Sequence, residues 1–259
     1  MTLNVNGINE RKQRENLFQF LLNQNAQIYF ITETHARKEN IKAFKDEWLD
    51  LGGENAFFEP TNKKGSSGVA ILFGKNFNPQ TSNINKMVPG KAFSIDANIH
   101  NINHTLLVTY APNKPAKRKI FFNEIDEKCH TTEKILWGGD FNCVENITLD
   151  RSSDSRESIH KEGALQIKKI KDTHFLSDPF REKNPNLFEY TFTARNTILR
   201  IGSRARLDRF YIPESYSKQS QTTFLHNIPN TDHDCVITTI KIKQKHEKGK
   251  PYCKFNVKL

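Results

Sequence analysis

The chain has 259 residues, of which 36% are hydrophobic and 10% aromatic, so it carries too much apolar mass for a disordered protein. Its 12 glycines and 10 prolines exclude a collagen-like or low-complexity chain, and its longest apolar run, Val69 to Phe73, is far shorter than the roughly 20 residues of a membrane span. The 39 lysines and arginines exceed the 29 acidic residues by 10, and this positive charge suits a polyanionic partner, above all nucleic acid.

The N-terminus and the cysteines indicate an intracellular protein. The first residues, MTLNVNGINE, contain no basic segment followed by an apolar stretch, so we expect no secretory signal. Cys129, Cys143, Cys235 and Cys253 lie too far apart for a CxxC or zinc-knuckle pattern. We interpret them as free thiols in a reducing compartment.

Helical and strand periodicities alternate along the chain. In chain order we expect a helix over 9–24, strands over 26–32, 68–73, 93–99 and 105–110, a helix over 115–129, a strand over 134–138, a helix over 160–172, and strands over 190–194, 206–212 and 235–242. The polar segment HNINH is expected to form a hairpin turn between the strands at 93–99 and 105–110.

This alternation, without a long linker, predicts a single domain of the α/β or α+β class. We place this domain at residues 1–243 and a basic C-terminal tail at residues 244–259. From Lys241 to Lys258 the sequence contains seven lysines against one acid, Glu247. We expect this end to be solvated, although its charge would also suit contact with phosphates.

Polar side chains recur at or near the ends of the predicted strands, which is the expected layout of an α/β active site. A lone carboxylate such as Glu33 offers Mg²⁺ a hard oxygen ligand, and a histidine beside aspartates suggests an imidazole held cationic by a carboxylate. The residues of this set are Asn4, Asn6, Glu33, Tyr110, Asp140, Asn142, Asp208, Asp232 and His233.

Each of these signals alone also fits an ordinary structural role. The segment 140–142 would suit a turn, the segment 231–233 a loop, Glu33 a surface charge and Asn4 a strand-end cap. The joint order of seven short motifs changes this interpretation. They are LNVNGI (3–8), ITET (31–34), GVAIL (68–72), TYAPN (109–113), GGDFN (138–142), LDRFYI (207–212) and TDHDCV (231–236).

In this order, and along essentially the whole chain, the motifs resemble the endonuclease/exonuclease/phosphatase superfamily. Within it, the chain is most similar to the apurinic-like endonuclease domain of LINE-type (non-long-terminal-repeat) retrotransposons. Asn6 stands where repair apurinic endonucleases usually carry aspartate, and LDRSS (149–153), EYTF (189–192) and the end GKPYCKFNVKL resemble the LINE-type domains. The resemblance implies a four-layer sandwich of two packed β-sheets flanked by helices, with the site in a cleft at one edge.

The resemblance also implies a metal cofactor. Glu33 would be the main ligand of Mg²⁺, for which Mn²⁺ could substitute. Asn4 and Asn6 would assist it, and Asp232 would be an outer carboxylate linked to the metal.

The remaining site residues would carry the chemistry, again as the resemblance implies. His233, oriented by Asp208, would contact the scissile phosphate. Asp140 would activate the water or serve the leaving group as acid or base, and Asn142 and Tyr110 would hold and polarise the phosphate. We therefore expect in-line attack of water, departure of the 3′ oxygen and a nick with a free 3′-hydroxyl. In a LINE-type element, that hydroxyl primes reverse transcription.

The segment 195–209 contains five arginines: Arg195, Arg200, Arg204, Arg206 and Arg209. In the family, the hairpin before the LDRFYI strand inserts into the DNA minor groove, and arginine suits a narrow, electronegative groove. The resemblance therefore implies DNA contacts for Arg195, Arg200, Arg204, Arg206 and Thr191. A solvated hairpin that only adds charge is the alternative.

The expected partner is double-stranded DNA, bound by a monomer in the nucleus, without contact to a membrane. Three features depart from the family. Thr32 replaces its usual glutamine, Thr231 replaces a serine, and Asn4 follows only three residues where the first strand normally begins earlier. The late start of the first strand would make the chain either a fragment of a longer polyprotein or a gene model begun at an internal Met, and the sequence stops before any reverse transcriptase domain.

Other functions remain open. An apurinic/apyrimidinic endonuclease of base-excision DNA repair would use the same catalytic set. A catalytically inactive DNA-binding module would keep the fold and the positive charge without turnover. A phosphatase acting on small phosphoesters or lipids also belongs to the superfamily, but the net charge and the arginine-rich segment favour DNA.

Overall fold

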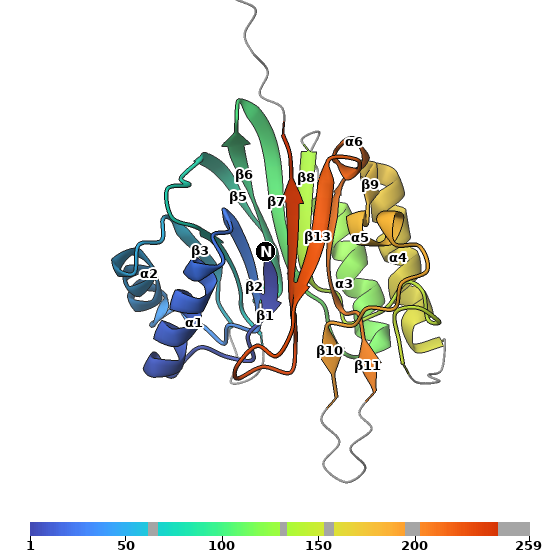
Figure 1. Cartoon of the computed structure of the whole chain (residues 1–259), viewed down its shortest axis with the longest axis horizontal. Coiled ribbons are helices and arrows are strands. Elements are labelled where there is room, and N and C mark those ends of the chain that lie inside the picture. The colour runs from blue at the N-terminus through green and yellow to red at the C-terminus, as the bar shows by residue number, and fades with distance from the viewer. Residues whose placement is uncertain (62–66, 130–133, 153–157, 195–202, 243–259) are drawn as a thin grey trace, which may run out of the picture.

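Two six-stranded sheets lie at the centre of the protein (Figure 1). The computed structural model describes residues 1–61, 67–129, 134–152, 158–194 and 203–242. The first sheet has the order β13 (Ser220–Leu225), β14 (Cys235–Ile240), β1 (Thr2–Asn4), β2 (Ile28–Thr32), β4 (Val69–Phe73) and β3 (Ala56–Glu59). The second has the order β5 (Gln80–Val88), β6 (Ala92–Ile99), β7 (Ile102–Tyr110), β8 (Lys134–Asp140), β12 (Asp208–Pro213) and β9 (Leu176–Ser177).

Helices cover the outer faces of both sheets (Figure 1). The first sheet is flanked by α1 (Arg11–Asn23) and α2 (Ile41–Asp50), and the second by α3 (Pro115–Lys128) and α4 (Ser158–His174). The short helices α5 (Pro179–Lys183) and α6 (Glu214–Ser217) and a ribbon of β10 (Phe192–Thr193) and β11 (Arg204–Ala205) complete the described elements. The predicted four-layer α/β sandwich is confirmed.

The strands are apolar on both faces because each sheet packs on two sides. In β4, Ile71 packs between the two sheets, whereas its neighbour Leu72 packs against the side chains of α1 and α2. In β12, Phe210 likewise faces the core between the sheets, and Tyr211 faces α3 and α4. The continuous apolar runs in the sequence therefore come from strands buried between two layers.

Most of the predicted elements are present, with two corrections at their ends. β7 begins at Ile102, three residues before the predicted start, because His100 and Asn101 alone make the turn, with φ angles of 53° and 61°. Two successive residues with positive φ are typical of a tight two-residue hairpin. β8 continues beyond its predicted end at residue 138 to Asp140, so Asp140 belongs to a strand rather than to a turn.

The strand pairing brings the polar strand ends to one edge. Asn4 of β1 pairs with Thr32 of β2 in parallel, directly before Glu33. Tyr110 of β7 pairs with Asp140 of β8 in parallel, and Asp208 of β12 pairs with Asp140 from the other side in antiparallel register. Carboxyl ends of parallel strands meet at the same edge of a sheet, so the polar residues of both sheets lie at this edge.

Gly139 allows β7 and β8 to approach each other next to Asp140. Its φ angle is +146°, and a Cβ atom there would lie 2.0 Å from the carbonyl oxygen of Thr109. We expect Gly139→Ala to destabilise the protein by roughly 1–3 kcal/mol, the usual cost of overpacking, in urea unfolding. Gly52→Ala is the matched control, because Gly52 has φ +96° and nothing within 4 Å of an added Cβ. Equal losses in both variants would contradict the steric explanation.

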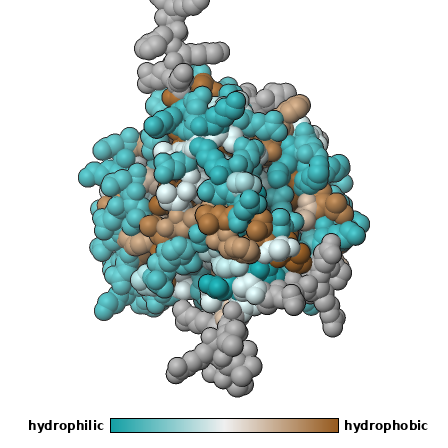
Figure 2. Space-filling view, turned by 45° about the vertical axis from the view of Figure 1, so that its right-hand side comes forward, coloured by the Kyte–Doolittle hydropathy of each residue, from teal (hydrophilic) through white to brown (hydrophobic). Residues whose placement is uncertain are grey.

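The surface is mainly hydrophilic. In the face shown in Figure 2, hydrophobic residues gather in a band across the middle, with hydrophilic residues above and below it. No helix among the described residues combines the length and apolar character needed to cross a membrane.

Candidate active site

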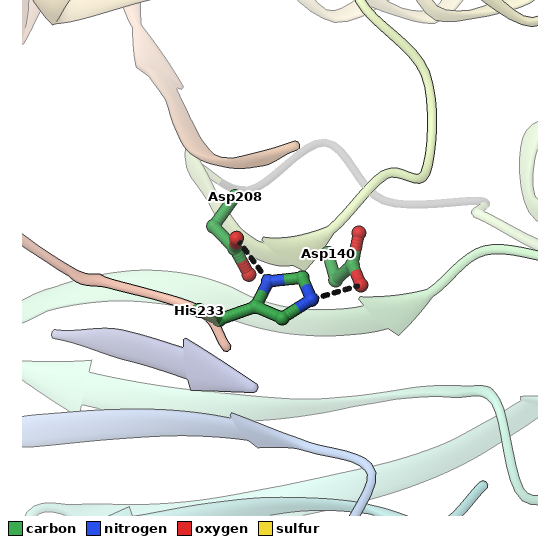
Figure 3. Close-up of side chains that lie close together, drawn as sticks. All are labelled: Asp140, Asp208 and His233. Atoms are coloured by element: carbon green, nitrogen blue, oxygen red, sulfur yellow. Dashed lines mark hydrogen bonds and ion pairs between the residues drawn. The ribbon is translucent and has the colours of Figure 1, made fainter. Parts of the chain in front are cut away.

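His233 lies between two buried aspartates at this edge (Figure 3). Its Nδ1 is 2.7 Å from Asp208 Oδ2, and its Nε2 is 4.0 Å from Asp140 Oδ2. The three residues come from β12, from the loop before β14 and from the end of β8. Segments distant in the sequence thus build one row of acid, imidazole and acid.

Two threonines fix the backbone around this row. The hydroxyl of Thr191 accepts hydrogen bonds from the N–H groups of Leu207 and Asp208, both at 2.9 Å. The hydroxyl of Thr231 donates to the carbonyl of Asn4 at 2.8 Å and accepts from the N–H of His233 at 3.1 Å. The loop that carries His233 is therefore tied directly to β1.

Charge and burial shift the pKa values of Asp140 and His233. Burial and the negative charge of Asp208 raise the pKa of Asp140 to about 7, although His233 and hydrogen bonds from Asn142 and Asn4 oppose this. Burial alone would lower the pKa of His233, but the charges of Asp208, Asp140 and Asp232 and the hydrogen bond to Asp208 raise it to about 10. At neutral pH, His233 is a cation beside a carboxylate that exchanges its proton readily, which suits acid–base chemistry.

Asparagines orient the Asp140 carboxylate. Asn4 Nδ2 donates to Asp140 Oδ2 at 3.0 Å, and the N–H of Asn142 donates to Asp140 Oδ1 at 2.8 Å. The side-chain amide of Asn142 donates to the carbonyl of Ala111 at 2.8 Å, and Asn4 Oδ1 accepts from the N–H of Asn6 at 3.1 Å. These bonds bring the predicted residues of β1, β8 and the following turn into one network.

Glu33 stands beside this network, directly after β2. Burial raises the pKa of its carboxyl group, but the polar groups of His35, Tyr110 and Asn4 and the charge of His233 outweigh burial and lower it. Glu33 is therefore an anion at neutral pH that interacts with Tyr110 and Asn4.

A cleft of about 460 Å³ collects most of the predicted site residues. Asn4, Asn6, Glu33, Asp140, Asn142, Asp232 and His233 line it. Asp208 and Tyr110 do not line the cleft. Asp208 contacts His233, and the side chain of Tyr110 interacts with Glu33. The wall also contains five polar residues that the sequence interpretation missed: Asn113, Arg118, Arg151, His160 and Ser203.

Two of these missed residues lay within quoted motifs. Asn113 ends TYAPN, and Arg151 belongs to LDRSS. Arg118 and His160 come from α3 and α4, and no signal in the sequence distinguishes them from other helical residues. Arg118 donates to the carbonyl of Asn142, so α3 reaches the turn that follows β8.

The structure corrects two predicted DNA contacts. Arg206 is 1% exposed and is bound by Asp150 and Asp178, so its guanidinium stabilises the interior rather than contacting a groove. Thr191 is fully buried, and its hydroxyl is occupied by two backbone N–H groups. Arg209, counted in the same basic segment, is also buried and donates to the carbonyl of Cys143.

Arg204 keeps an exposed position that is compatible with DNA contact. It lies on β11, and its guanidinium carbon is 4.7 Å from the centre of the Tyr190 ring. Arg195 and Arg200 lie outside the described residues, as does the predicted tail at 244–259.

Two groups of residues could hold a metal. The carboxylates of Glu33 and Asp232 and the amide oxygens of Asn4 and Asn6 line one cleft and form an oxygen donor set that fits Mg²⁺. Among the described residues, Asp140, Asp208 and His233 also place ligand atoms within 4.8 Å of one another.

Comparison with known proteins agrees with this geometry. The model of the endonuclease/exonuclease/phosphatase family matches residues 1–233. The chain belongs to this family. The family resemblance inferred from the seven motifs is therefore confirmed, and the site described above is that of a family member.

One curated relative of this family member comes from a transposon. The uncharacterized 149 kDa protein of transposon TX1 from Xenopus laevis is 27% identical over 267 residues, covering all of this chain but 19% of the relative. The chain thus spans about one fifth of that protein.

Solved structures share its fold. The apurinic endonuclease LMAP of Leishmania major superimposes with a TM-score of 0.73 at 17% identity, covering 90% of this chain and 84% of that one. The endonuclease domain of TRAS1, a telomere-specific non-LTR retrotransposon, gives a TM-score of 0.65 at 13% identity, covering 93% and 97%.

Proposed function

We propose that the chain is a Mg²⁺-dependent DNA endonuclease that hydrolyses one phosphodiester bond and leaves a nick with a free 3′-hydroxyl. The observation that carries the proposal is the row of Asp208, His233 and Asp140 beside Glu33 in one cleft of a basic protein. A buried imidazolium and a carboxylate with a pKa of about 7 provide, side by side, a positive charge for a phosphate and an acceptor for a proton.

Each site residue has a separate role in the proposed hydrolysis. His233, held by Asp208, places its positive charge against a non-bridging oxygen of the scissile phosphate. Asp140 accepts a proton from the attacking water and Asn142 holds the phosphate in place, whereas Tyr110, which does not line the cleft, acts on Glu33. Asp208 keeps the imidazole oriented and charged through the 2.7 Å contact. The increase of negative charge in the transition state is thus met by groups that are already in position.

We place the metal-binding site at Glu33 and the neighbouring residues that offer oxygen ligands. Asn4, Asn6 and Asp232 would complete the binding site, and Mn²⁺ would substitute for Mg²⁺. A divalent cation bound there would supply further positive charge to the phosphate. Removal of the metal with EDTA is therefore expected to stop nicking.

The biological setting is proposed from the transposon relative and the motifs. The 3′-hydroxyl would prime reverse transcription by a polymerase domain, and the protein would act as a monomer in the nucleus. The likeness to LMAP supports a second candidate function, an apurinic/apyrimidinic endonuclease of DNA repair.

A labelled duplex oligonucleotide, either intact or with one abasic site, separates these functions. In Mg²⁺ we expect cleavage of the intact duplex, and we expect DNA polymerase to extend the product from the nick. Cleavage of the abasic duplex alone would identify a repair enzyme instead. Binding of both duplexes without cleavage would identify an inactive DNA-binding module.

The rate of nicking is expected to follow a bell-shaped pH profile. Asp140 must be ionised to accept a proton, so the rate rises as pH increases through about 7. His233 must be protonated, so the rate falls as pH increases through about 10. In Asp208→Asn the upper limb should move to lower pH, because the charge of Asp208 is the main factor that raises the pKa of His233. An upper limb that stays in place in this variant would contradict the assignment of His233.

A further inference from the structure

The residues directly after β2 hold an uncommon backbone conformation. Glu33 and His35 have φ angles of 54° and 55°, in the left-handed region that side chains other than glycine rarely adopt. Four backbone hydrogen bonds hold this segment from two sides. Gly7 and Ile8 donate to the carbonyls of Glu33 and Thr34, and the N–H groups of Thr34 and His35 donate to Gly68 and Ser67.

This conformation brings the side chains of Glu33 and His35 close together. On a regular strand, the side chains of two residues at this sequence spacing would point to the same face but would lie farther apart. His35 Nε2 lies 3.7 Å from Glu33 Oε2, which is beyond hydrogen-bond length. The Nε2 atom is buried and has no hydrogen-bond partner. A buried polar atom without a partner is uncommon and calls for a ligand, an ion or water.

Gly7 makes room for the imidazole. A Cβ atom at Gly7 would lie 2.5 Å from His35 Nδ1, and the φ angle of Gly7 is +93°. Both the glycine of the LNVNGI motif and the strained segment therefore serve one arrangement, in which His35 Nε2 lies beside the carboxylate of Glu33, and Glu33 lines the cleft. Backbone strain that the surrounding structure fixes in place is typical of functional sites.

We propose that His35 supplies a nitrogen ligand to the divalent cation that Glu33 binds. This inference rests on the proposed function, which places the metal at Glu33. Two ligand atoms that are each about 2.1 Å from one ion lie at most about 4.2 Å apart, and the observed 3.7 Å falls within this limit.

A nitrogen ligand changes which metal the site prefers. Mg²⁺ favours oxygen ligands, whereas imidazole suits transition metals, and Mn²⁺ binds more tightly than Mg²⁺ when a nitrogen donor is present. His35 would thus bias an otherwise oxygen-lined site toward Mn²⁺. If His35 only oriented Glu33 through a hydrogen bond, it would affect both metals alike.

The test measures metal binding by the full chain without DNA. Mn²⁺ affinity is obtained from the EPR signal of free Mn²⁺, and Mg²⁺ affinity from competition. We expect His35→Gln to weaken Mn²⁺ binding about 10-fold or more and Mg²⁺ binding less than about 3-fold. His226→Gln is the matched control, because His226 also contacts a carboxylate, that of Asp234, which unlike Glu33 does not line the cleft. Equal weakening for both metals, or none for either, would overturn the proposal.

A spectroscopic measurement on the wild-type chain tests the proposal even if His35→Gln does not fold. Pulsed EPR of Mn²⁺ bound to the wild-type chain should show the coupling of one directly bound ¹⁴N nucleus, and its absence would refute the nitrogen ligand. Glu33→Gln separates this inference from the proposed function. Unchanged Mn²⁺ affinity in Glu33→Gln would reject the metal site itself, whereas loss in Glu33→Gln without loss in His35→Gln would reject His35 alone.

Discussion

Replacement of Asp140 by asparagine is expected to slow nicking about 10³-fold, in the range typical of a lost general base. The carboxylate has a pKa of about 7, so it can accept a proton at neutral pH, whereas an amide cannot. Asparagine has nearly the same shape and keeps one acceptor for the N–H of Asn142 or the amide of Asn4. We therefore expect DNA affinity to change little. Single-turnover rates on a labelled duplex would measure the loss.

The matched control for this variant is Asp172→Asn, which removes an exposed carboxylate on α4 that pairs with Lys168. It should leave the rate unchanged. An Asp140→Asn protein that binds DNA and nicks at the wild-type rate would show that the proton acceptor lies elsewhere.

Replacement of Arg206 by leucine is expected to lower the free energy of unfolding by about 3–5 kcal/mol, the usual cost of breaking a buried ion pair from one side. The guanidinium contacts Asp150 Oδ1 at 2.8 Å and Asp178 Oδ2 at 2.7 Å, and all three side chains are buried. Without it, two carboxylates remain in the interior. Arg181 also contacts Asp150 and would compensate only that partner. Urea unfolding would measure the loss.

Arg204→Leu is the control, because Arg204 lies two residues away on the exposed side of β11. We expect a stability change within about 0.5 kcal/mol, as for most surface substitutions, together with weaker DNA binding. The opposite pattern, in which Arg206→Leu folds normally but binds DNA poorly, would restore the minor-groove contact predicted for Arg206.

These two arginines show what local sequence can and cannot predict. Both lie in one basic segment, and nothing near either of them in the sequence distinguishes a buried cation from an exposed one. The difference comes from Asp150 and Asp178, which are distant in the sequence and meet Arg206 only in the folded chain. Thr191 was misplaced for the same reason, because its backbone partners belong to β12 and the residue before it.

Four of the strands that sequence patterns missed, β3, β5, β9 and β13, are edge strands. β5 and β13 lie at the ends of their sheets, are largely exposed or half-buried and are rich in Asn, Gln, Ser and Thr. Such strands lack the apolar run of a strand covered on both sides. The helix α2 was also missed, although Phe44 and Trp48 show helical spacing and are both buried.

Part of the site could be predicted from periodicity, because Glu33, Tyr110 and Asp140 end or directly follow strands that the apolar runs reveal. Asn4, Glu33, Asp140 and His233 line the same cleft as expected. The pairing of His233 with Asp208 needed the resemblance to a family, since periodicity does not show which strand ends face each other. The contribution of His35 was missed because it depends on the positive φ angles of Glu33 and His35, which no pattern of residues specifies.

Relaxation of supercoiled plasmid in Mg²⁺ tests the central claim most directly. The wild-type chain would be assayed beside Glu33→Gln and His233→Gln, with folding of each protein established by urea unfolding and with EDTA as the metal-free control. We predict that the wild type converts the plasmid to the nicked circle only in the presence of metal, and that both variants lose this activity. A folded wild-type chain that leaves the plasmid supercoiled, or variants that nick as fast as the wild type, would contradict a metal-dependent nuclease centre at Glu33 and His233.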